Sequence, residues 1–168
     1  MSESTGDTNP SDAAKTSRVF LLVLDDTDEL TVALGYACQR ARKSGGRVAL
    51  LYVMEPDEFQ QWMMVQDLMR EEKRQEAEQR LQRYARRVFD RTGTFPILFL
   101  REGQRREELL KLIEEEPSVS VLVLGAGTGP EGPGPLVSHL TGKGLGRLRV
   151  PLTIVPGNLT EEQLDAIT

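Results

Sequence analysis

The sequence predicts an α/β domain in which helices cover both faces of a parallel, five-stranded sheet, a doubly wound arrangement. Five short apolar runs of strand length are separated by segments that carry the three-to-four-residue apolar spacing of helices. The first run is apolar at every position, which is typical of a strand that is buried on both faces. Because strands alternate with helices, the strands are expected to run parallel to one another, within a domain of residues 18–156.

The first β/α unit begins with the apolar run 19–24, which ends in a cluster of acidic residues. We expect Asp26 to cap the following helix, with Glu29 three residues on in the capping-box position. Apolar residues then recur at helical spacing over residues 30–41, and the glycines at 45 and 46 end the helix.

The second unit combines the strand 48–53 with a long helical segment over residues 59–91. A helix of that length exceeds the usual domain helix, and residues 70–76 are charged on every side, so we expect a bend or break near Arg70. The cluster Trp62, Met63 and Met64 has two interpretations, a core contact or a partner surface rich in adaptable side chains.

The remaining elements follow the same alternation. Residues 96–100 predict a third strand with a proline at its start, and residues 103–116 predict a third helix that Pro117 ends. The runs 119–124 and 152–155 predict the last two strands. In the C-terminal extension, 157–168, Thr160 and Gln163 form a capping box that predicts a short helix. Residues 1–17 have no apolar pattern and are expected to form a disordered tail.

Composition and charge exclude several classes of function. The net charge of −5 and the pI near 5.1 argue against nucleic acid as a partner, because phosphate backbones favour clustered Lys and Arg. No run approaches the roughly 20 apolar residues of a membrane span, and the N-terminus lacks the order of a signal peptide. The single cysteine, Cys38, lies on the apolar stripe of the first helix and is expected in the core. We therefore expect a cytoplasmic protein with neither a nucleic-acid nor a membrane partner.

The stretch between the fourth and fifth runs, G-A-G-T-G-P-E-G-P-G-P, has the composition of a phosphate-binding loop. Glycine amides in such loops donate hydrogen bonds to phosphates without side chains in the way. Three prolines remove donors, and the only charged residue of the stretch is Glu131. Each lost charge-assisted bond forfeits roughly 1.5–3 kcal/mol, so a few losses turn micromolar affinity into millimolar. The amides that remain as donors are those of Gly127, Gly129, Gly132 and Gly134.

Other chemical motifs are not supported. The spacing of Gly127, Gly129 and Gly132 fits a dinucleotide fingerprint by letter, but prolines delay the helix that this motif requires. Gly142 and Lys143 lack the other residues of a P-loop. His139 is the only histidine, so a zinc site and a catalytic Ser/His/acid trio are not expected.

Taken together, these features resemble the universal stress protein family. The resemblance rests on an Asp that closes the first strand, on five β/α units of this length and order, and on a glycine loop before the strand V-P-L-T-I-V-P. It covers residues 18–156 and implies a sheet of order 3-2-1-4-5, often paired into a homodimer through the fifth strand. That order places Asp25 and Gly125 across a crevice where chain direction reverses, the usual ligand position in α/β sheets.

Family members that bind ATP carry G-x2-G-x9-G-(S/T) after the fourth strand. Gly125 matches the first glycine, but Thr128 stands at the second, Ser138 at the third and His139 at the Ser/Thr position. A frame shifted to Gly129 restores three glycines but begins well past the strand, so we prefer the first frame. The candidate nucleotide-crevice residues that the resemblance implies are Asp25, Val53, Gly125, Gly127, Gly129, Ser138 and His139.

Two hypotheses of function follow. The first is a non-enzymatic stress-response homodimer that acts through protein partners, requires no cofactor and binds ATP weakly or not at all. The second is a regulator that binds ATP or AMP through the 125–139 loop, with slow hydrolysis as an option. The prolines and the missing third glycine favour the first, whereas the retained Asp25 and the remaining glycines favour the second.

Overall fold

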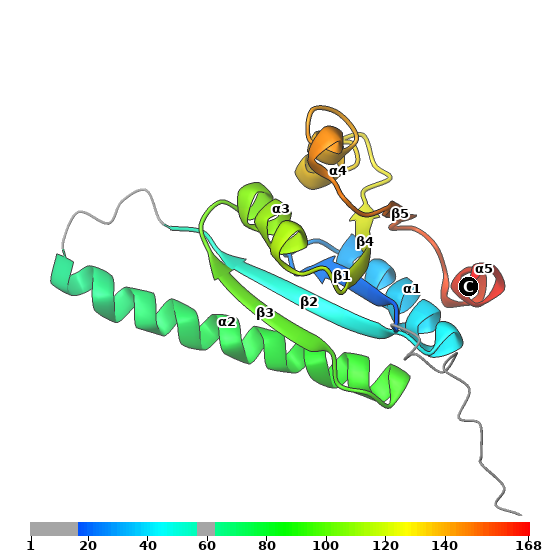
Figure 1. Ribbon diagram of the computed structural model, residues 1–168, viewed down its shortest axis with the longest axis horizontal. Helices are drawn as coiled ribbons and strands as arrows, with labels where there is room; N and C mark the ends of the chain where they lie inside the picture. The colour runs from blue at the N-terminus through cyan, green and yellow to red at the C-terminus, as the bar shows by residue number, and fades with distance from the viewer. Residues whose placement is uncertain (1–16, 57–62) are drawn as a thin grey trace, which may run out of the picture.

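The structure, a computed structural model, describes residues 17–56 and 63–168, and the side chains from residue 67 onward in the second of these ranges. Five strands form one parallel sheet of order β3-β2-β1-β4-β5, which confirms the predicted fold class and order (Figure 1). The predicted tail 1–17 lies almost wholly outside these residues, and so does Trp62; of Met63 and Met64 the side chains are not described. The strands are β1 (Val19–Val23), β2 (Arg47–Met54), β3 (Ile97–Glu102), β4 (Val119–Ala126) and β5 (Leu152–Pro156).

Helices cover both faces of this sheet (Figure 1). In chain order they are α1 (Glu29–Ser44), α2 (Met63–Thr92), α3 (Arg105–Glu115), α4 (Pro135–Leu140), the 3-10 turn η2 (Leu145–Arg147) and α5 (Glu161–Ile167). The side chains of each central strand point alternately into two hydrophobic cores, one on each face of the sheet. In β1, Val19, Leu21 and Val23 pack with the buried residues of α3 and α4, whereas Phe20 and Leu22 pack with those of α1, α2 and α5. The continuous apolar run therefore serves two opposite faces, as a strand in the middle of a doubly wound sheet requires.

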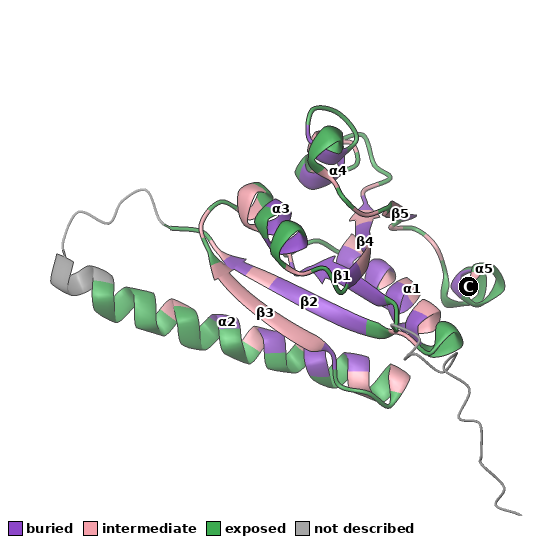
Figure 2. Cartoon of the chain, in the orientation of Figure 1, coloured by how far each residue is buried: buried purple, intermediate pink, exposed green. Residues whose placement is uncertain are grey.

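Helix α2 is a single helix across residues 63–92, so the predicted break near Arg70 is wrong. At 1.5 Å per residue it is about 45 Å long and extends beyond the sheet at its N-terminal end (Figure 1). Most of residues 67–76 are exposed, and only the later turns bury side chains (Figure 2). The segment is rich in Glu, Arg, Lys and Gln and contains neither Gly nor Pro. These residue types have high helix propensity, so the helix continues where its side chains are mostly exposed to solvent.

Helix α5 confirms the predicted capping box. The Thr160 side chain accepts a hydrogen bond from Gln163 N, and the Gln163 side chain accepts one from Thr160 N. Leu164 is buried in the core between α1 and α2, and Arg91 of α2 pairs with Glu161 at 2.8 Å. This ion pair lowers the pKa of Glu161, mainly through the hydrogen bond from Arg91. The C-terminal extension is thus docked on the α1 face of the domain.

Cys38 is buried in α1, as predicted, with 2% of its surface exposed. Desolvation raises the pKa of its thiol from 9.0 to about 11, against the smaller opposing effect of Arg91. The thiol therefore stays protonated at neutral pH and behaves as a small apolar group. No helix within residues 17–56 and 63–168 is both long and apolar enough to cross a membrane.

Candidate functional site

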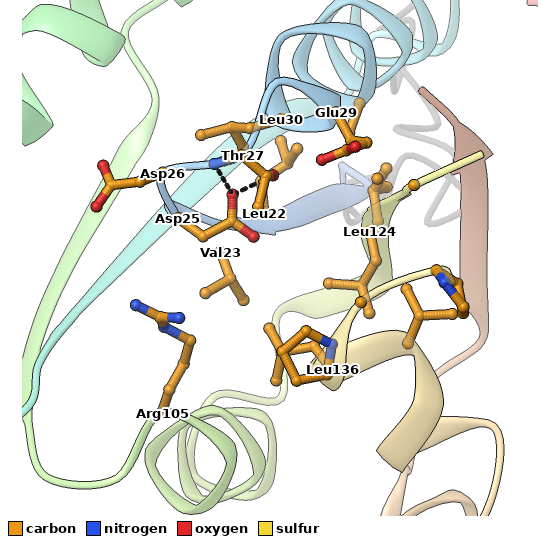
Figure 3. A pocket seen from close by; sticks show the side chains of 18 of the residues that line it. Leu22, Val23, Asp25, Asp26, Thr27, Glu29, Leu30, Arg105, Leu124 and Leu136 are labelled. Atoms are coloured by element: carbon orange, nitrogen blue, oxygen red, sulfur yellow. Dashed lines mark hydrogen bonds between the residues drawn. The ribbon is translucent and has the colours of Figure 1, made fainter. Parts of the chain in front are cut away.

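A crevice of about 480 Å³ lies at the carboxyl ends of β1 and β4. The chain leaves these neighbouring strands in opposite directions, so the crevice occupies the topological switch point of the sheet. Its volume falls in the range of roughly 300–1,000 Å³ that small-molecule sites occupy. Asp25 at the end of β1 and Gly125 in β4 both line it, as the predicted strand order requires. Figure 3 shows Asp25 and its neighbours on the crevice wall.

The turn after β1 forms one wall of the crevice. Oδ1 of Asp25 accepts hydrogen bonds from the Thr27 backbone N–H at 3.2 Å and from the Thr27 hydroxyl at 2.6 Å (Figure 3). One carboxylate oxygen of Asp25 thus stabilises the turn, which is a structural task.

The predicted capping box at the start of α1 is wrong. The helix begins at Glu29, its N-cap residue is Asp28, and the Asp28 side chain forms no capping hydrogen bond. The Asp26 carboxylate instead pairs with Arg80 of α2. Local spacing favoured a cap at Asp26. The turn at Asp25 instead moves the start of the helix to Glu29, and the Asp26 carboxylate pairs with Arg80 of the distant helix α2.

The glycine loop forms the second wall, and it is hydrogen-bonded to itself. The Gly127 N–H donates to Pro133 O at 3.2 Å, and the Gly132 N–H donates to Gly129 O at 3.2 Å. Gly134 has φ of 107°, a conformation that side-chain-bearing residues rarely adopt, and it leads directly into α4. Two of the four glycine amides that the sequence offered as phosphate donors are therefore already used inside the loop.

Gly125 and Glu29 are in close contact. A Cβ atom at Gly125 would lie 2.5 Å from Glu29 O and 2.8 Å from Glu29 Cβ. The first turn of α1 thus packs directly on the backbone of β4, which only a glycine permits. Gly125, the one position that matches the family's ATP motif, is required here for packing even without a ligand.

The charges on the crevice walls are mostly negative. Four carboxylate residues line it, and Arg105 at the start of α3 is the one Lys or Arg among the lining residues. The Arg105 side chain extends from α3 into the crevice on the side of Asp25 and Asp26, whereas Glu29 lies on the β4 side (Figure 3). The Nε atom of Arg105 is buried and has no hydrogen-bond partner among the residues described. The carboxylate residues are Asp25, Asp26, Glu29 and Glu131.

The structure brings together some of the predicted site residues but not all of them. Asp25, Gly125 and Gly127 line the crevice, whereas Gly129 and Ser138 do not. The two remaining predicted residues, Val53 and His139, also lie outside the crevice lining.

Val53 lines a neighbouring cavity of about 270 Å³ at the end of β2, which shares Arg105 with the crevice. His139 lies outside the crevice lining, with its Nδ1 atom 3.2 Å from a terminal guanidinium nitrogen of Arg106. The His139 ring also packs against Gly144, where a Cβ would approach to 2.7 Å. In the part of the chain that the structure describes, no group of three or more His, Cys, Asp or Glu residues is placed to hold a metal ion.

Sequence reasoning gave no site role to several residues of the crevice, among them Arg105 and Glu29. Arg105 is the first residue of a helix that follows a parallel strand. Because this position always faces the carboxyl edge of the sheet, the sequence could have indicated Arg105 as a site residue. Glu29 was assigned to a helix cap, and nothing in its local sequence indicates that it contacts β4.

Comparison with known proteins supports the fold. A search of curated protein sequences finds no significant match. Among solved structures, the chain is similar to universal stress protein UspA from Lactobacillus plantarum, with a TM-score of 0.67 and 14% identity over 82% of this chain and 97% of that one. It is also similar to a universal stress protein family member from Burkholderia pseudomallei, with a TM-score of 0.59 and 20% identity over 84% and 98% of the two chains.

A third similar structure is a universal stress protein in complex with cAMP, with a TM-score of 0.53 and 18% identity over 83% of this chain and 97% of that one. The family assignment itself comes from the sequence, because the family model described as "Universal stress protein family" matches residues 16–156. That match spans most of the chain and includes all five strands. The chain therefore belongs to the universal stress protein family.

Proposed function

We propose that this protein is a non-enzymatic, cytoplasmic universal stress protein that acts in the stress response as a homodimer through protein partners, with weak or no binding of ATP. The observation that carries the proposal is the charge of the crevice. Four carboxylate residues and a single guanidinium line the crevice. Because ATP is a polyanion, the excess of negative charge on the crevice walls opposes its binding.

The loop supports the same conclusion. Its Gly127 and Gly132 amides donate to carbonyls of the loop itself, so a phosphate would have to displace hydrogen bonds that already exist. The prolines remove three further donors. A site of this kind offers an anion little compensation for the water that it loses on binding.

The non-enzymatic part of the proposal draws on the position of the only histidine. His139 contacts Arg106 and does not line the crevice, so it is poorly placed to act as a general base on a ligand there.

A direct test combines native mass spectrometry of the purified protein with thermal melting in Mg-ATP. We expect no bound nucleotide and little change in Tm. A Kd of about 10 µM would stabilise the protein by about 3.7 kcal/mol at about 5 mM ligand, a shift of several degrees for a protein of this size. A copurified nucleotide or a shift of that magnitude would contradict the proposal.

The homodimer is proposed to form through β5. This strand is at the edge of the sheet, and its Ile154 side chain is 39% exposed. An exposed edge with an apolar side chain is suited to pairing with a second copy. Sedimentation at tens of micromolar protein tests this, because a monomer mass would reject it. Ile154→Lys should dissociate the dimer, whereas Leu68→Lys, at an exposed leucine of α2, should leave it intact.

A second candidate function, an ATP- or AMP-binding regulator, is favoured by specific observations. The crevice has a suitable volume and position, and the buried Arg105 Nε has no partner among the described side chains. One similar structure is a complex with cAMP. The melting experiment above, repeated with AMP and cAMP, distinguishes the two candidates because the second requires a clear shift with one of these ligands.

A further inference from the structure

Glu29 is held in one place by three glycine positions. Its carbonyl oxygen lies 2.5 Å from the position of a Cβ at Gly125, and its Cγ is in still closer contact with the position of a Cβ at Gly157. Its carboxylate Oε1 lies 3.3 Å from the corresponding point at Gly127. The backbones of β4, of the glycine loop and of the turn after β5 thus surround this one side chain.

The carboxylate of Glu29 therefore lies against the loop that phosphates would have to approach. Among the residues that the structure describes, none forms an ion pair or a side-chain hydrogen bond with Glu29. In the view of Figure 3, the Arg105 side chain lies away from Glu29, toward the side of the crevice that carries Asp25 and Asp26. Glu29 is the first residue of α1, so its side chain starts at the N-terminus of that helix.

We propose that Glu29 is the specificity determinant of the crevice, a fixed negative charge at the start of α1 that lies against the glycine loop and discriminates against phosphorylated ligands. The inference rests on the proposed function, because it explains why the crevice binds ATP poorly. It predicts a ranking by ligand charge: adenosine is affected least by Glu29, AMP more, and ATP most.

The expected size follows from Coulomb's law. For one phosphate charge about 6 Å from the carboxylate, removal of the repulsion strengthens binding about threefold at the dielectric constant of water and about a hundredfold at that of a protein surface. An intermediate gain of about tenfold is therefore expected for ATP, and it should shrink as salt is added.

The test uses Glu29→Gln, which keeps the shape of the side chain and removes its charge. Amide NMR titrations detect millimolar Kd values and are run with adenosine, AMP and Mg-ATP on the wild type and the variant. We expect the Kd for ATP to fall about tenfold and that for adenosine to change less than about twofold. The matched control is Glu162→Gln, an exposed carboxylate of α5 outside the crevice lining, which should change the Kd for ATP less than about twofold.

Each other outcome overturns a defined part of the argument. Equal gains in affinity for adenosine and ATP would show that Glu29 acts through the volume of its side chain and not through its charge. An unchanged affinity for ATP would reject the inference, while the proposed function would stand. Micromolar binding of ATP by the wild type would reject the proposed function itself. Glu29→Ala serves as the second variant if Glu29→Gln proves poorly folded by circular dichroism, and it carries the same prediction for the ratio of ATP to adenosine affinity.

Discussion

The contact between Gly125 and Glu29 can be tested through stability alone. In Gly125→Ala the new Cβ would lie 2.5 Å from Glu29 O, so the first turn of α1 must retreat by at least 0.5 Å to reach even a 3.0 Å contact. The atoms in the way belong to backbone, which cannot rotate aside as a side chain would. Forced displacement of packed elements costs about 1–3 kcal/mol, so we expect the free energy of unfolding to fall by that amount.

Urea denaturation without nucleotide, at one protein concentration for all variants, measures this difference. Thermal melting should give a Tm lower by about 2–4 °C for each kcal/mol lost. The matched control is Gly129→Ala in the same loop, where a Cβ would meet no atom within 4 Å and the backbone is not left-handed. That variant should be unchanged or slightly more stable, by up to about 1 kcal/mol. If both variants unfolded at the same midpoint, the packing role of Gly125 would be refuted.

Three further predictions concern residues outside the crevice. Thr160→Ala should lower the stability of α5 by about 1 kcal/mol, because it removes the cap, and should speed amide hydrogen exchange in that helix; unchanged exchange would contradict this. The Cys38 thiol has a raised pKa in the folded protein, so its contribution to stability is complete below pH 9.0 and is lost as pH rises toward about 11; Cys38→Ala should lack this loss in urea titrations. Arg149→Met should cost about 1.5–3 kcal/mol, because the guanidinium donates to carbonyls at the end of α3, including Ile113 O at 2.9 Å, and a change under 0.5 kcal/mol would speak against that role.

Several features of the fold could be read from short stretches of sequence. The apolar runs, the helical spacing of α1 and the capping box at Thr160 each depend on neighbours a few residues apart, and the structure confirms all three. The burial of Cys38 followed from its place on an apolar stripe. Strand order came with the family resemblance, which rested on the sequence of β/α units and on the glycine loop.

The same local reasoning failed where a contact joins distant elements. Asp26 pairs with Arg80, which is 54 residues away in the sequence. The residues next to Asp26 could not indicate that this ion pair would form in place of a helix cap. Helix α2 continues where a break was predicted, because a segment of charged residues with high helix propensity stays helical when it is exposed to solvent.

By itself, the sequence determined the family, the order and type of the elements and the position of a glycine loop after β4, because periodicity, caps and turn residues act over a few positions. Only the tertiary structure decided what that loop faces. The order of the sheet brings α1 onto β4, and this places the Glu29 carboxylate beside Gly127 and leaves Gly125 as a packing position. The charge of the crevice is thus a property of elements that meet in space, and no local pattern encodes it.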